Sequence, residues 1–183
     1  INALHVRDDG SMIMSFNANG FSVPGLIGGP SGTTVDDSDL VLFTPTTTGA
    51  NTSGTFTFLL DGSDLGLTTN GEDIDGVWET PSGDLRISTQ GTVNTIGTNW
   101  RDEDVILLSN PVFGAASSGT WSQYFDGSDV GFNNSGGEDI GAISFRANGD
   151  FRFSTVGTYS AAGGAGADED VSNFSGSYGT STS

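Results

Sequence analysis

The sequence predicts an all-β fold of three homologous four-stranded units, of which the last one is incomplete. Glycine accounts for 29 of the 183 residues, and Ser, Thr, Asn and Asp are also abundant, a mixture that favours turns and short strands over helices. Short segments alternate apolar with polar residues, whereas few windows carry the 3.6-residue period of an amphipathic helix. The same succession of strands, turns and acidic clusters is found three times along the chain.

The repeats define a single domain over residues 1–183, divided into units at 1–73, 74–139 and 140–183. A repeat of this length with several strands is typical of propeller blades. We therefore expect a β-propeller-blade-like arrangement, with a three-fold β-prism as the alternative. In blades of this kind we expect the fourth strand of one unit to complete the sheet of the next, which would leave the first sheet without an outer strand.

Each unit begins with a predicted hairpin. The three hairpins read INALHVRDDGSMIMS, IDGVWETPSGDLRIS and IGAISFRANGDFRFS, and they align without a gap. Each turn contains a glycine, which allows the positive φ that tight hairpins require; these are Gly10, Gly83 and Gly149. In the second strand apolar residues alternate with polar ones, as Phe151 and Phe153 do around Arg152, so one face of each hairpin is predicted to pack.

A polar loop and an acidic cluster lead from each hairpin to a third strand, predicted at 40–44, 105–109 and 171–174. Fourth strands are predicted at 54–60 and 119–125, after turns that contain Pro or Gly. The third unit stops where its fourth strand would begin, so we expect eleven strands and an open edge. Because an unpaired edge readily binds another strand, the expected partners are neighbouring repeats or a second copy of the chain.

Two acidic loops are the main candidates for function: DGSDLGLTTNGEDI at 61–74 and DGSDVGFNNSGGEDI at 126–140. Each loop places two carboxylates around a Gly-Ser step and a second acidic pair directly before a strand. Carboxylates within about 6 Å raise one another's pKa unless a cation lies among them. The loops therefore predict a hard cation with oxygen ligands, which we expect to be calcium. The alternative is that these side chains cap turns through hydrogen bonds to the local backbone.

The candidate calcium ligands form three groups. The DGSD sequences supply Asp61, Asp64, Asp126 and Asp129, and the GED sequences supply Glu72, Asp73, Glu138 and Asp139. The acidic clusters before the third strands supply Asp37, Asp39, Asp102, Asp104, Asp168 and Asp170. These clusters either complete the same ions from an adjacent unit or only mark the starts of strands. No stretch matches the twelve-residue EF-hand loop, so the sequence leaves open which carboxylates share an ion.

The net charge of −18 limits the choice of partners, since 23 acidic residues face five arginines and no lysine. Such a surface repels phosphate backbones and anionic lipids, which argues against nucleic acid and membrane surfaces. No apolar run approaches the ~20 residues of a membrane-spanning helix, which argues against membrane insertion. Sixteen of the acidic residues lie in the repeated motifs, and this favours specific cation sites over a general high-salt surface.

The composition also suggests a compartment. The chain contains no cysteine, which excludes disulfides and thiol chemistry. Weak calcium sites of extracellular modules have Kd values on the order of 10⁻⁴–10⁻³ M, which the cytoplasm does not saturate. An acidic, lysine-free, Gly/Thr/Ser-rich chain with such sites is therefore expected outside the cell or on its surface. Because its first residue is Ile and no signal-like segment is present, we expect a piece of a longer protein.

The segments DGSDLGL, DGSDVGF, GEDIDGV and DEDV resemble the DGSDVGL, GEDIDAL and DEDV motifs in repeats of large secreted bacterial proteins. Here the resemblance is carried by residues 61–89 with 102–108 and by 126–155 with 168–174. The first unit departs from the pattern, because Asp37-Ser-Asp39 replaces the acidic triplet and a longer loop precedes it. The resemblance implies propeller-like units. It implies no defined activity.

The leading functional hypothesis is a non-enzymatic, calcium-stabilised extracellular module for adhesion, surface coating or strand-exchanging fibre assembly. The alternative is a carbohydrate-binding or carbohydrate-cleaving domain of a larger secreted enzyme. Paired carboxylates could serve a glycosidase, but an active site rarely recurs in every unit of a repeat. The only histidine, His5, has no counterpart in the other units, which argues against a Ser-His-Asp site. Trp100, in a polar loop beside Arg101, is the candidate for stacking on a sugar.

Overall fold

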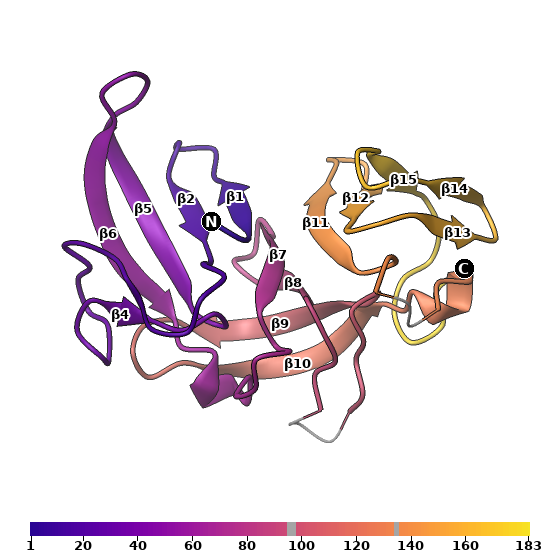
Figure 1. Ribbon diagram of the computed structural model, residues 1–183, viewed down its shortest axis with the longest axis horizontal. Coiled ribbons are helices and arrows are strands. Elements are labelled where there is room, and N and C mark those ends of the chain that lie inside the picture. Colours follow the sequence, from indigo (N-terminus) through magenta and orange to yellow (C-terminus); the bar gives the residue numbers. More distant parts are fainter. Residues whose placement is uncertain (95–97, 134–135) are drawn as a thin grey trace.

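The computed structural model of the protein describes residues 1–94, 98–133 and 136–183 (Figure 1). Within these ranges the protein is all-β, as the sequence predicts, with several small antiparallel sheets, none of which is closed. The described helical elements are two single-turn 3-10 helices, η1 (Ser63–Leu65) and η2 (Ser128–Val130). The described part of the chain contains no helix that is long and apolar enough to cross a membrane.

The first sheet contains four strands in the order β1-β2-β5-β6. Their bounds are β1 Leu4–Val6, β2 Met12–Met14, β5 Leu40–Thr47 and β6 Ser53–Leu60. The loop between β2 and β5 contains a small hairpin of β3 (Phe21–Ser22) and β4 (Thr34–Val35). Because β6 pairs with β5 of its own unit, the expectation that a fourth strand completes the sheet of the next unit is wrong.

The second sheet repeats this strand order as β7-β8-β9-β10. Its strands are β7 Ile74–Glu79, β8 Leu85–Thr89, β9 Val105–Val112 and β10 Ser118–Phe125. The third and fourth strands of both sheets are the longest, with eight residues each. In Figure 1 β9 and β10 form the long ribbon that runs under the middle of the molecule.

The third sheet has three strands, β11 (Ile140–Phe145), β12 (Phe151–Thr155) and β15 (Ser172–Phe174). A separate hairpin of β13 (Tyr159–Ala161) and β14 (Gly164–Gly166) follows β12 (Figure 1). One edge of β15 pairs with β12, and no strand among the described residues pairs with its other edge. The first three strands of the preceding sheets are thus reproduced here, and the fourth is not.

The turn of the first hairpin in each sheet has the predicted backbone conformation. Gly10, Gly83 and Gly149 have φ values of 83°, 89° and 91°, a region that only glycine adopts without strain.

The polar face of the second hairpin packs against aromatic rings. The guanidinium of Arg86, on β8, stacks on the rings of Tyr124 and Phe145, at 4.0 and 4.1 Å from their centroids.

Apolar residues from neighbouring sheets form the core. The first strand of the second sheet, β7, contacts both β1 and β11, so the first strands of the three sheets lie side by side. Ile74 and Ile140, which begin two of these strands, are fully buried. One buried cluster joins the first and second sheets, and an aromatic cluster around Phe125 and Phe151 joins the second sheet to the third. The places where consecutive sheets meet are called the first and the second junction below.

Candidate functional site

The DGSD loops begin with a sharp bend at glycine. Gly62 and Gly127 precede η1 and η2, and their backbone lies against residues that come before the third strand of the same unit. A Cβ atom at Gly127 would overlap the carbonyl oxygen of Glu103, and one at Gly62 would overlap that of Ser38. Glycine is therefore required here by close approach of two backbone segments, and not by a positive φ.

The carboxylates within each DGSD loop accept hydrogen bonds from neighbouring groups. In the first loop Asp61 Oδ1 accepts from the Ser63 hydroxyl at 2.6 Å and from the Ser63 N–H at 3.1 Å. The Gly62 N–H donates to Asp39 at 3.1 Å. The second loop repeats these bonds, with Asp126, Ser128 and Asp104 as the acceptor and donor residues.

Each DGSD loop also docks on the turn between the third and fourth strands of the next unit. For the first loop, the Asp61 N–H donates to Ser117 Oγ, and the Ser117 N–H donates to Asp64 Oδ2, both at 2.9 Å. Beside them the Gly114 N–H donates to the Leu59 carbonyl at 2.8 Å. These three bonds tie the end of β6 to the turn between β9 and β10.

The same three bonds recur between the second DGSD loop and the C-terminal residues. The Asp126 N–H donates to Thr182 Oγ1, and the Thr182 N–H donates to Asp129 Oδ2, both at 2.9 Å. The Gly179 N–H donates to the Tyr124 carbonyl at 2.7 Å. Equivalent atoms in two different units make equivalent contacts, so the DGSD loop works as a connector between consecutive units.

The equivalent turn of the first unit is a natural control for this contact. Thr52 donates its hydroxyl to the Gly49 carbonyl at 2.9 Å, as Ser117 does to Gly114. No DGSD loop docks on it among the described residues, and Thr52 is exposed, whereas Ser117 and Thr182 are buried. Thr52, Ser117 and Thr182 thus make the same bond within their turns, but a DGSD loop docks only on Ser117 and Thr182 in the described part of the chain.

We expect Ser117→Ala to lower the free energy of unfolding by about 1.5 kcal/mol, because the buried Asp61 N–H loses its acceptor. Thr182→Ala is expected to have a similar effect at the other contact. Thr52→Ala should change stability by less than about 0.5 kcal/mol, as exposed sites usually do. Urea denaturation of the three variants measures the difference; equal losses at all three positions would contradict the connector role.

The GED glutamates cap their own loops. Glu72 Oε2 accepts from the N–H groups of Thr68 and Thr69 at 2.5 and 2.8 Å, and Oε1 accepts from the Asn94 N–H at 3.4 Å. Glu138 accepts from the N–H groups of Asn133 and Ser160. Turn capping, the alternative that the sequence left open, therefore describes the glutamates and one oxygen each of Asp61 and Asp126.

Five carboxylates among the described residues have buried oxygens that no hydrogen-bond donor contacts. Asp73 is one of them, at the first junction; the other four, Asp75, Asp102, Glu103 and Asp139, meet at the second junction and are each at most 7% exposed. One oxygen of each Asp and both oxygens of Glu103 are buried without a hydrogen-bond partner. The nearest cation is Arg101, whose Nη1 lies 3.8 Å from Glu103 Oε1. Four buried acids therefore face one partly exposed arginine, and we call them the junction carboxylates.

Burial, together with repulsion from neighbouring carboxylates, raises the pKa of three of these four groups. Burial, with the neighbouring Asp139, raises the pKa of Asp75 well above its usual value, although the Ser88 hydroxyl donates to Asp75 at 2.9 Å. Burial also raises the pKa of Asp139 and that of Glu103 to about 7 each. Without a cation, the junction therefore holds protons that ordinary carboxylates would release.

The first junction carries fewer acids at the equivalent places. Asp37 and Asp73 correspond to Asp102 and Asp139, and burial raises the pKa of Asp37 to about 7. Asn2 and Ser38 stand where the second junction has Asp75 and Glu103. The Asn2 side chain donates to the Ile74 carbonyl at 3.1 Å. The first junction therefore has two acids at the places where the second junction has four.

The fourteen predicted ligands thus divide by environment. Asp39, Asp104 and Asp170 each accept a backbone N–H bond from the residue three positions before them. Asp39 and Asp104 are buried and also accept from the Gly62 and Gly127 N–H groups, whereas Asp168 and Asp170 are exposed on the third unit. No group of three or more His, Cys, Asp or Glu side chains in the described residues already has the arrangement of a metal site. Sequence reasoning missed Asp75 and Glu103; their signal was an extra acid at two positions where the first unit has Asn2 and Ser38.

Trp100, the predicted sugar-stacking residue, is buried with 6% of its surface exposed. Its backbone pairs with Val93, which folds the polar loop back on itself, and its ring meets that of Trp121 edge to face at 6.5 Å. The ring is part of the core between the first two sheets. It therefore presents no open face to a sugar.

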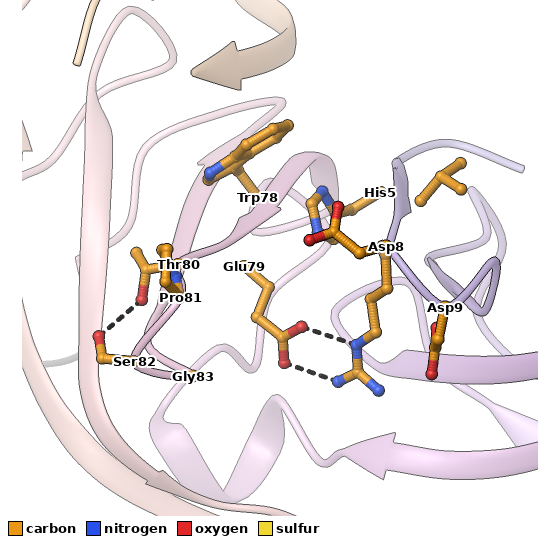
Figure 2. Close-up of a pocket in the computed structure, with 11 residues that line it drawn as sticks. His5, Asp8, Asp9, Trp78, Glu79, Thr80, Pro81, Ser82 and Gly83 are labelled. Atoms are coloured by element: carbon orange, nitrogen blue, oxygen red, sulfur yellow. Dashed lines mark hydrogen bonds and ion pairs between the residues drawn. The ribbon is translucent and has the colours of Figure 1, made fainter. Parts of the chain in front are cut away.

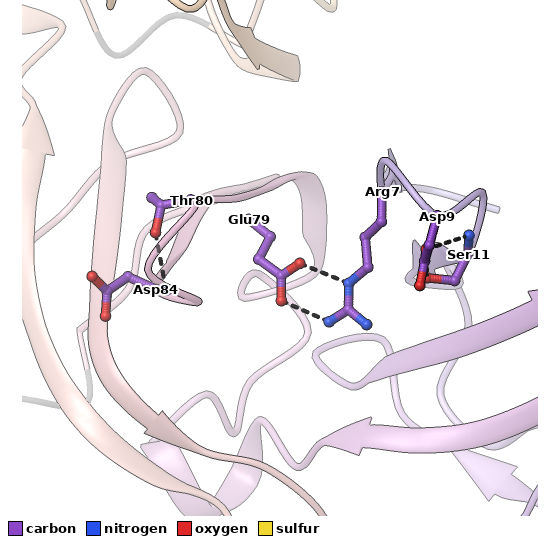
Figure 3. Close-up of polar contacts among 6 residues, drawn as sticks. All are labelled: Arg7, Asp9, Ser11, Glu79, Thr80 and Asp84. Carbon is purple, nitrogen blue, oxygen red and sulfur yellow. Dashed lines mark hydrogen bonds and ion pairs between the residues drawn. The ribbon is translucent and has the colours of Figure 1, made fainter.

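A cleft of about 610 Å³ lies between the turns of the first hairpins of units 1 and 2 (Figure 2). The Arg7 guanidinium crosses it and donates two hydrogen bonds to Glu79, both at 2.6 Å (Figure 3). His5 packs edge to face on Trp78 at 4.6 Å, and burial lowers the pKa of His5. Arg7 belongs to unit 1 and Glu79 to unit 2, so this ion pair links the two units across the cleft.

The chain matches no protein-family model, and neither a curated protein nor a solved structure matches it. Its function has to follow from the chemistry of its own residues.

Proposed function

We propose that this protein is a non-enzymatic extracellular β-repeat module whose junctions bind calcium, and that it serves in adhesion, surface coating or fibre assembly. The observation that carries the proposal is the set of junction carboxylates: four buried acids with five oxygens that no donor satisfies. A buried carboxylate without a partner costs several kcal/mol unless it is protonated or neutralised. A divalent cation would neutralise the group and leave the units fixed to one another.

Oxygen chemistry favours calcium over other ions. The four junction side chains are all carboxylates, the chain contains no cysteine, and its single histidine is His5. Calcium accepts six to eight oxygen ligands in flexible geometry, whereas magnesium requires a regular octahedron. The carboxylates of the structure stand in pairs, Asp75 with Asp139 and Asp102 with Glu103. Binding would draw the two pairs together around one ion, which a flexible coordination shell tolerates.

Several observations support a propeller-blade-like relation of the units. Two sheets have consecutive strands in sequence order, and the third begins in the same way. Their first strands β1, β7 and β11 are neighbours, as the innermost strands of blades are. The DGSD connector makes the same contacts from unit 1 to unit 2 and from unit 2 to unit 3. An open arc of such units suits a spacer or an adhesive surface better than it suits a catalytic pocket.

The matched pair of variants for this proposal is Glu103→Gln and Glu169→Gln. Both residues are the centre of a DED triplet, but Glu103 is buried at the junction and Glu169 is exposed. At about 100 times Kd, calcium should stabilise the wild type by about 2.7 kcal/mol per site, which would raise Tm by about 5–10 °C. Because affinity follows ligand charge, Glu103→Gln should weaken calcium binding about tenfold, and Glu169→Gln should leave it unchanged.

Calorimetric titration with calcium, and Tm in calcium and in EDTA, measure these effects, with magnesium as the control ion. The proposal fails if Tm is the same in both solutions, or if the two glutamine variants bind alike. The carbohydrate alternative depends on the cleft between the hairpin turns, since Trp100 is buried. Binding on a glycan array, with no effect of calcium on Tm, would favour it.

A further inference from the structure

The third sheet has an apolar groove beside its open edge. The groove has a volume of about 460 Å³, and aromatic rings form much of its wall: Phe125, Phe132, Phe153, Tyr159 and Phe174. Phe174 lies on β15, whose outer edge pairs with no strand among the described residues. Phe174 is only partly buried, whereas the other four rings are at most 8% exposed. The groove therefore presents one incompletely covered ring beside the unpaired backbone groups of an open edge.

The second unit shows what fills the same space when the sheet is complete. The counterparts of the groove residues there are Leu60, Leu67, Ile87, Val93 and Leu108, and each is at most 1% exposed. Trp121 from β10 packs against this cluster, and its indole N–H donates to the Leu65 carbonyl at 3.0 Å. In β9, Leu108 stands directly opposite Trp121. The fourth strand thus closes the core with one aromatic side chain.

The third unit reproduces this site except for the strand. Phe151 pairs with Phe174 in the register in which Leu85 pairs with Leu108. Tyr159 pairs with Gly166 in the way that Val93 pairs with Trp100. Gly166 therefore stands beside the groove at the position where the second unit has the Trp100 side chain. The groove is therefore the space that Trp100 and Trp121 occupy in the second unit. A strand placed as β10 is placed would bring its aromatic residue opposite Phe174.

The turn that leads into such a strand is already formed. Ser177 and Ser183 exchange backbone hydrogen bonds at 2.8 and 3.3 Å, at the places where Val112 and Ser118 pair in the second unit. Thr182 is held by the second DGSD connector, as described above. The backbone after this turn is consequently aimed along the open edge of β15, antiparallel to it.

We infer that the groove beside β15 binds an extended strand with a Gly-Thr-aromatic pattern, running antiparallel to β15 with its aromatic ring between Phe174 and Tyr159. The occupant is a fourth strand from a further repeat of this type. This deepens the assembly role in the proposed function by naming the partner, but it does not depend on calcium. The β10 strand of a second copy of this chain cannot be the occupant, because it is already paired with β9 in its own sheet.

The test extends the chain after Ser183 with Gly-Thr-Trp-Ser-Gln-Tyr-Phe, the sequence of residues 119–125, and compares it with the same extension carrying Ser in place of Trp. The tryptophan form should raise Tm by about 5 °C or more over the unextended chain. It should also slow amide exchange at Asn173 on β15, and the serine form should do markedly less. All measurements are made in EDTA, so that the result is separate from the calcium proposal.

A second arm adds the heptapeptide in trans to the unextended chain, followed by amide chemical shifts. Shifts confined to β15 and the groove would show that the strand can come from another molecule; shifts absent here but present in the extended chain would restrict it to the same chain. The inference is overturned if the two extended chains have the same Tm and the same exchange rates as the unextended protein.

Discussion

In the presence of EDTA, the protein is expected to lose stability as the pH rises from 5 to 8, which is the reverse of ordinary acid denaturation. Burial raises the pKa of Asp75 well above its usual value and that of Asp139 to about 7. Between the unfolded value near 4 and these folded values, the native state binds more protons than the unfolded state. Stability therefore decreases with pH over this range. The stabilising contribution of Asp139 is fully present below about pH 4 and is lost as the pH passes 7, and that of Asp75 also falls as the pH rises.

The size of the effect follows from the shift, because one pKa unit corresponds to about 1.4 kcal/mol. Because Asp75 and Asp139 titrate as a coupled pair, we expect a combined loss of about 2 kcal/mol between pH 5 and pH 8. Asp104 and Asp39, whose pKa burial raises to about 6, act in the same direction. His5 acts in the opposite direction, since burial lowers its pKa. Calcium should abolish the decline, because it binds the ionised carboxylates.

Asp75→Asn separates the junction from the other titrating groups. The amide keeps the shape of Asp75 and carries no charge, so in EDTA at pH 8 the variant should be more stable than the wild type. In calcium it should be less stable, since a ligand charge is lost. Urea unfolding at pH 5, 6.5 and 8 in both solutions measures this reversal. A variant that is destabilised equally in EDTA and in calcium would show that Asp75 has only a packing role.

The sequence was sufficient for those features that depend on local chemistry. Alternating apolar residues and turn glycines predicted the hairpins, and the fourth strand expected at 54–60 is found as β6. The small hairpins β3–β4 and β13–β14 were not predicted, because their Gly- and Ser-rich segments lack clear alternation. Their pairing depends on the elements around them and not on their own residues.

The features that depend on contact between units could not be read from one unit at a time. Glu103 belongs to an acidic triplet that looks the same as the triplet around Glu169, but Glu103 is buried, with the DGSD loop at Gly127 lying against it, whereas Glu169 is exposed. Trp100 illustrates the same limit, because a tryptophan in a polar loop suggests exposure until Val93 draws the loop into the core. Equivalent residues thus acquire different roles according to whether a next unit covers them.

Gly127→Ala is expected to be the most damaging single substitution at the second junction, with a loss of about 3 kcal/mol. The added methyl group would overlap the Glu103 carbonyl oxygen and crowd the Glu103 side chain, and backbone on both sides must move to relieve this. That movement would displace both the second DGSD connector and one of the junction carboxylates. Gly127→Ala should therefore weaken calcium binding as well as folding.

Gly163→Ala is the matched control, because Gly163 is exposed, no φ in the left-handed region applies to it, and nothing lies within 4 Å of the added Cβ. It should change stability by less than about 0.5 kcal/mol. If Gly127→Ala lowered the free energy of unfolding no more than this control does, the close approach of the two backbone segments would not contribute to stability. A large loss of stability with unchanged calcium affinity would instead show that the connector and the carboxylates act independently, since the ion would then bind without the bend at Gly127 being held in place.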